Sequence, residues 1–83
     1  MNTEDPIAAL KRQLAQLIVE RVAGWSQMDA ADLLGTDQPR VSDLRHGRLE
    51  RFSLDQLVRF VGRIDGAIEL RVTWSPRRAF LFR

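Results

Sequence analysis

Residues 26–47, SQMDAADLLGTDQPRVSDLRHG, decide the fold of this chain because they hold two short helical patterns separated by a tight turn. The first pattern is closed by Gly35, a residue suited to the left-handed position after a helix. The second begins after Asp37, a natural N-cap, and stops at Gly47. The stretch therefore predicts two short helices joined by a three-residue turn.

The second of these helices is almost entirely polar. Its strong apolar residues are Val41 and Leu44, and its polar residues are Gln38, Arg40, Ser42, Asp43, Arg45 and His46. Such a helix is anchored by one narrow stripe and leaves a wide polar face outside. A helix-turn-helix needs this asymmetry, because its first helix braces across the phosphate backbone while its second offers polar residues to base edges.

Two longer helices are predicted on either side. The first begins at Asp5 as N-cap, with Pro6 in the first helical position. Its apolar stripe is Ile7, Leu10, Leu14, Leu17, Ile18 and Val22. The last begins at a capping box formed by Ser53 and Gln56, followed by Leu54, Leu57, Val58, Val61 and Ile64 at helical spacing.

Between these helices, the helix that follows Ser26 has a short apolar face. We expect Met28, Ala31 and Leu34 to be buried there. We also expect Trp25 to pack in the core between helices.

After the helices the hydrophobic period changes to two. Ile68, Leu70, Val72 and Trp74 alternate with polar residues, which predicts a half-buried strand and our candidate dimerisation surface. Residues 79–82 suggest a return strand. A four-residue loop would place Leu81 opposite Val72, whereas a loop of three or five residues would align Phe80 and Phe82 with that face. We expect residues 1–66 to form the helical part and residues 67–83 a strand or hairpin of the same domain.

The composition excludes several classes of site. There is no cysteine, so disulfides and thiolate metal sites are excluded, and a single histidine makes a metal site unexpected. Ser42, Asp43 and His46 share one helix but lack the enclosure of a catalytic triad, so we expect neither an enzyme nor a cofactor. No apolar run is long enough to span a bilayer and the N-terminus is acidic, which predicts a cytoplasmic protein.

The charge is divided unevenly along the chain. The formal net charge is only +2, but residues 37–83 hold ten arginines against six acidic residues. A basic half suits a polyanion partner. The alternative is a bias toward arginine codons, since Lys11 is the only lysine.

The motif resembles a known family of repressors. Residues 25–35 together with the run Gln-Pro-Arg-Val-Ser-Asp-Leu at 38–44 resemble the Xre, or lambda-Cro-like, repressors. With Gly47 and the segment FSLDQLV from Phe52, the chain is similar to HigA-type antitoxins over about residues 14–74. The resemblance implies a mainly α fold, a lambda-repressor-like four-helix domain followed by a C-terminal β-strand or hairpin.

The resemblance also implies site residues. Gln27 matches a phosphate-binding glutamine, and the base-facing positions are Gln38, Arg40, Ser42 and Asp43. Arg45, Arg48 and Arg51 suit backbone phosphates. Arginine pairs with guanine, glutamine with adenine, and aspartate accepts from cytosine. Asp43 also repels phosphate, so its alternative roles are to orient Arg40 or to cap the chain locally. The alternative for all these side chains is a solvated helix face.

The function implied is transcriptional repression. The chain would be an antitoxin, a homodimer on a palindromic DNA operator, that represses its own operon and neutralises a RelE/HigB-like toxin protein. Two recognition helices about 34 Å apart would read both half-sites. The alternatives are a standalone or phage Xre-type repressor, and a protein-interaction module that retains the fold.

Overall fold

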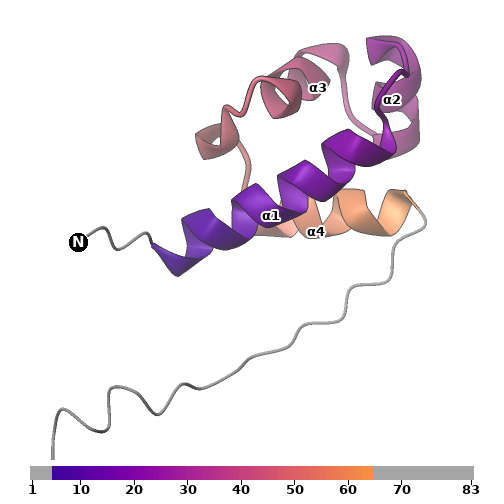
Figure 1. Ribbon diagram of the computed structural model, residues 1–83. Coiled ribbons are helices and arrows are strands. Elements are labelled where there is room, and N and C mark those ends of the chain that lie inside the picture. Colours follow the sequence, from indigo (N-terminus) through magenta and orange to yellow (C-terminus); the bar gives the residue numbers. More distant parts are fainter. Residues whose placement is uncertain (1–4, 65–83) are drawn as a thin grey trace, which may run out of the picture.

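The computed structural model describes residues 5–64. These residues form four α-helices and one short 3₁₀ helix (Figure 1). The elements are α1 (Pro6–Arg21), α2 (Gln27–Leu34), α3 (Gln38–Arg45), η1 (Leu49–Arg51) and α4 (Leu54–Arg63). The helical part of the expected fold is therefore confirmed.

Each α-helix begins at a side chain that caps it. Asp5, Ser26, Asp37 and Ser53 accept hydrogen bonds from the backbone N–H groups of the first turn. At α4 the cap is reciprocal, because the Gln56 side chain also accepts from the backbone N–H of Ser53 at 3.0 Å. These four starts are the ones that the sequence predicts, since capping depends on residues within one turn.

Among the described elements, α1 and α4 pack most extensively against each other, and α2 and α3 lie across one side of α1 (Figure 1). The Arg21 guanidinium donates to the Ile64 carbonyl at 3.3 Å and joins the two C-terminal ends. The core lies between the helices, with Ile18 and Leu57 fully buried. Its other members are Ala15, Val22, Ala30, Ala31, Leu34, Val41, Leu44, Phe52, Phe60, Val61 and Ile64.

Several residues expected in the core lie on the surface. Leu17 is 45% exposed and Ile7 47%, because α1 turns Ala15, Ile18 and Val22 inward.

The same correction applies around α2. Met28 is 59% exposed and Trp25 44%. The buried face of α2 is Ala30, Ala31 and Leu34, and its alanines allow the helix to approach its neighbours closely. A helix of eight residues has too few apolar positions for periodicity to fix which side is buried.

One element is absent from the sequence predictions. The 3₁₀ turn η1 connects α3 to α4 and leads into Phe52, which is buried with its ring edge-to-face against Phe60 at 6.1 Å. The predicted strand at Ile68–Trp74 and the boundary after residue 66 lie outside the described residues. Residues 5–64 themselves contain no strand.

Candidate nucleic-acid interface

The outward side of α3 carries an open hollow. It is lined by Gln27, Asp37, Gln38, Pro39 and Ser42, so it lies between the first turns of α2 and α3. Three of the predicted DNA-contacting residues, Gln27, Gln38 and Ser42, are thus brought to one surface.

The electrostatics of this hollow are mixed. The N-termini of two helices carry partial positive charge and unpaired N–H groups, which favour an anion. The Asp37 side chain, however, accepts from the Arg40 backbone N–H at 2.9 Å and also lines the hollow. Its carboxylate offsets part of the helix field, so this surface suits neutral base edges better than a dense row of phosphates.

The Arg40 side chain extends toward η1. Its guanidinium donates to the Arg51 carbonyl and lies over the Phe52 ring at 5.2 Å from the centroid. In the free protein Arg40 therefore links α3 to the end of η1. A bidentate contact with guanine requires that it leave the aromatic ring.

Arg45 joins α3 to the turn between α1 and α2. Its Nη2 donates to the carbonyls of Val22 and Trp25, each at 3.0 Å. These carbonyls follow the last turn of α1, where a cation is also favoured by the helix dipole. Arg45 Nη2 therefore stabilises the fold by binding the turn that follows α1.

Asp43 forms an ion-pair cluster beside α3. Its side chain is only 11% exposed, and its Oδ1 accepts from Arg48 Nε at 2.9 Å and from Arg51 Nη1 at 3.3 Å. The hydrogen bond from Arg48 is the main reason that the pKa of Asp43 lies below its ordinary value, with both positive charges adding to the effect. Of the four predicted base-facing residues, Asp43 is the one whose side chain is buried.

His46 is a further exposed polar residue beside α3, outside the predicted DNA-contacting set. His46 is exposed one turn after Ser42, and its Nδ1 donates to the Ser42 carbonyl at 2.8 Å. The spacing of four from Gln38 to Ser42 and again to His46 places all three on one side, with His46 at the C-cap of α3. That spacing was the available signal.

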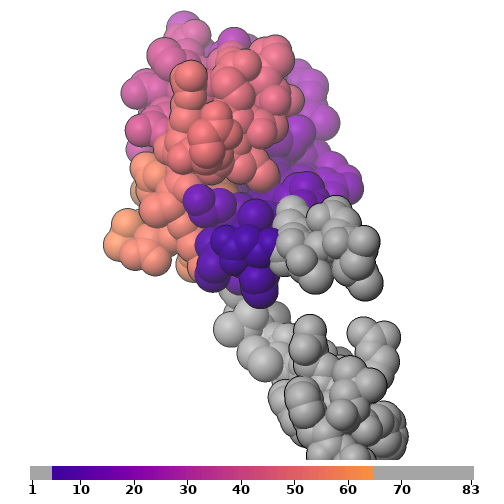
Figure 2. Space-filling model, turned by 90° about the vertical axis from the view of Figure 1, so that its left-hand side faces the viewer, coloured from indigo at the N-terminus to yellow at the C-terminus, as the bar shows by residue number. Residues whose placement is uncertain are grey.

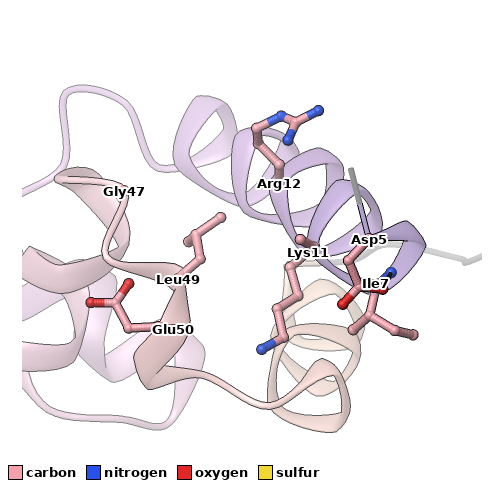
Figure 3. A pocket seen from close by; sticks show the side chains of 8 residues that line it. Asp5, Ile7, Lys11, Arg12, Gly47, Leu49 and Glu50 are labelled. Atoms are coloured by element: carbon pink, nitrogen blue, oxygen red, sulfur yellow. Dashed lines mark hydrogen bonds between the residues drawn. The ribbon is translucent and has the colours of Figure 1, made fainter. Parts of the chain in front are cut away.

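A second hollow, of about 390 Å³, lies between the start of α1 and η1. Figure 2 shows the η1 region directly above the start of α1. Lys11 and Leu49 reach toward this space from opposite sides (Figure 3). Its charged lining is balanced, with Asp5 and Glu50 against Lys11 and Arg12. This hollow has no excess of positive charge, and none of the predicted DNA-contacting residues lines it.

Other kinds of site are not apparent in residues 5–64. No group of three or more histidine or acidic residues there has a metal-binding arrangement. In the same range no helix has the length and apolar character needed to cross a membrane.

A comparison with protein families decides the assignment. The family model described as a helix-turn-helix domain matches residues 1–73. The chain belongs to the helix-turn-helix family. The match extends over all the helices of this helix-turn-helix protein that the structure describes, and it indicates a DNA-binding regulator. No curated protein matches the chain.

Proposed function

We propose that this protein is a sequence-specific, DNA-binding transcriptional repressor. The observation that carries the proposal is the hollow on the outer side of α3, where Gln38 and Ser42 are presented together with Gln27 from α2. In this arrangement α3 lies in the major groove, its first turns face the base edges, and Gln27 binds a phosphate at the start of α2.

The arginines predicted to contact DNA differ in the partners that they have in the free protein. Arg48 and Arg51 are 41% and 57% exposed and bind backbone phosphates beside α3. Arg40 reads guanine only when it leaves Phe52. Arg45 binds the carbonyls of the α1–α2 turn, so its main role is to stabilise the fold.

The biological role that we propose is that of an antitoxin. Residues 38–44 and the segment from Phe52 carry the resemblance to HigA-type antitoxins. In this role a cytoplasmic homodimer binds a palindromic operator upstream of its own gene and neutralises a RelE/HigB-like toxin. A standalone repressor would share the operator binding and lack the toxin.

A second candidate is a protein-interaction module, and specific observations favour it. Arg40, Arg45, Arg48 and Arg51 all have partners within the chain, and Asp37 adds negative charge to the hollow. Exposed Trp25 and Met28 near the start of α2 are the kind of large apolar side chains that anchor protein interfaces.

The experiment that tests the proposal is a fluorescence-anisotropy titration at two salt concentrations. The probes are DNA from upstream of the protein's own coding sequence and a scrambled duplex. The proposal requires selective binding that weakens steeply as salt rises. Absent or unselective binding would favour the protein-interaction module.

Substitutions in α3 separate reading of bases from attraction to phosphates. We expect Gln38→Ala to cost about 1–3 kcal/mol at one base pair and to relax the preference there. The matched control is Gln13→Ala, on an exposed position of α1. Equal loss on all sequences after Arg40→Ala would assign Arg40 to the backbone.

A further inference from the structure

Asp43 occupies an unusual position on the recognition helix. Val41 and Leu44 face the core, while Gln38 and Ser42 line the outward hollow. Asp43 faces neither, and instead points to the segment that follows the helix. Among residues 5–64 it is the only charged residue that is buried.

The segment after α3 is folded around this carboxylate. The Arg48 backbone N–H donates to the Asp43 carbonyl at 2.9 Å, so the turn closes directly on this residue. One carboxylate oxygen then accepts from both Arg48 Nε and Arg51 Nη1. The shared oxygen holds two guanidinium groups close together although their like charges repel.

Both arginines have N–H donors that do not contact Asp43. An arginine has five N–H donors, and the contacts with Asp43 use one from each side chain. The two side chains remain 41% and 57% exposed. A planar guanidinium fork matches the geometry of a phosphate group. The cluster thus presents paired, solvent-facing donors at the end of the recognition helix.

We propose that Asp43 is a positioning residue for DNA binding, which holds Arg48 and Arg51 together so that their remaining N–H groups meet one backbone phosphate beside α3. This inference rests on the proposed DNA-binding function. Long flexible side chains lose rotamer freedom when they bind. With Asp43 in place that freedom is lost during folding, before DNA arrives.

The sign of the effect distinguishes positioning from simple electrostatics. Removal of a negative charge near DNA, by itself, strengthens binding because the DNA is a polyanion. Loss of a positioning residue weakens binding, because two unrestrained arginines must be ordered at the phosphate. A base-reading Asp43 would instead weaken binding to one preferred sequence only.

The test uses the full chain and two fluorescein-labelled duplexes, the upstream DNA and its scrambled control. We expect Asp43→Ala to weaken binding about tenfold on both duplexes. Asp43→Asn retains the size and the acceptor oxygen, and we expect a smaller loss. The control Glu50→Gln removes a neighbouring exposed carboxylate, so binding should be unchanged or tighter.

A double-mutant cycle separates positioning from a structural role. Arg48→Gln and Arg51→Gln should each weaken DNA binding in the wild-type background and much less in the Asp43→Ala background. Circular dichroism of each variant measures the folded fraction, and affinities are compared per folded molecule. Asp43→Asn keeps the test informative if the alanine variant does not fold.

Several outcomes would overturn the inference. They are unchanged or tighter binding by both Asp43 variants, loss confined to the upstream duplex, or arginine effects that are the same in both backgrounds. If wild-type protein binds neither duplex at low salt, the proposed function fails and this inference fails with it. Wild-type binding without the Asp43 effect overturns the inference alone.

Discussion

Arg45 shows how a polar residue of α3 can serve the fold. The sequence places it on a polar helix face, where an arginine that binds phosphate and one that binds carbonyls look the same. Its partners, Val22 and Trp25, lie 23 and 20 positions away in the sequence, beyond any local pattern. The hydrogen-bond partners of Arg40 and Asp43 are nearer in the sequence, 11 positions from Arg40 and 5 and 8 positions from Asp43, but these separations also exceed the spacing of three or four residues within a helix. The sequence could therefore predict which residues lie on α3, but not which of their side chains bind other parts of the protein.

The first prediction at this scale concerns Arg45→Ala. The change leaves two backbone carbonyls without a charged donor, so we expect the free energy of unfolding to fall by about 2 kcal/mol. Urea unfolding followed by circular dichroism measures it. Arg59→Ala, at an exposed position on α4, should stay within about 0.5 kcal/mol of wild type. Equal effects of the two changes would contradict the structural role of Arg45.

A second prediction concerns pH. The pKa of Asp43 is lowered in the folded protein, chiefly by the Arg48 hydrogen bond. Its stabilising contribution is therefore complete above the ordinary value near 3.8 and is lost as pH falls through the folded pKa.

We expect Asp43→Asn to be less stable than wild type at neutral pH, with the difference narrowing in acid. Urea unfolding at a series of pH values measures both. Gln13→Ala, at an exposed position of α1, changes no titrating group, so its stability curve should run parallel to that of wild type. A constant difference between wild type and Asp43→Asn would contradict the prediction.

At the scale of the elements, the helix starts follow from local chemistry. Caps such as Ser26 and Ser53 act within one turn, and the sequence predicted them correctly. The buried faces were harder. Leu17 and Met28 are exposed because tertiary packing selects the alanine-containing faces of α1 and α2. The 3₁₀ turn η1 has no pattern of its own and was not predicted.

Two glycines, Gly35 in the turn after α2 and Gly62 inside α4, should respond in opposite ways to substitution by alanine. Gly35 has φ +73°, and a Cβ there would come within 2.8 Å of Arg63 Nη2. Gly62 lies inside α4, where a Cβ would have no neighbour within 4 Å. We expect Gly35→Ala to destabilise the protein by about 1–2 kcal/mol and Gly62→Ala to stabilise it by about 0.5–1 kcal/mol. Thermal unfolding of both variants checks the pair, and shifts of the same sign would contradict the turn geometry.

At the scale of the whole molecule, one copy of α3 spans too few base pairs to select an operator. A second copy about 34 Å away would double the sequence that is read. The alternation of Ile68, Leu70, Val72 and Trp74 is the feature of the sequence that suits a contact between copies. A lone hairpin is at best marginally stable in water, so the predicted strand or hairpin would need such a contact.

The last prediction tests that contact. If the predicted strand joins two copies, lysine at both Ile68 and Val72 should convert the dimer to a monomer, because two charges would replace apolar side chains on one side of that predicted strand. Lysine at Glu69 and Thr73, on the alternate side, is the matched control and should leave the dimer intact. Light scattering measures the oligomeric state of each variant. The monomeric variant should also lose its preference for a palindrome over a single half-site, since each copy then binds alone. If the variant with both Ile68 and Val72 replaced is still a folded dimer, the contact between copies lies elsewhere. If the wild-type protein binds a half-site as a monomer, no contact between copies is needed for DNA binding.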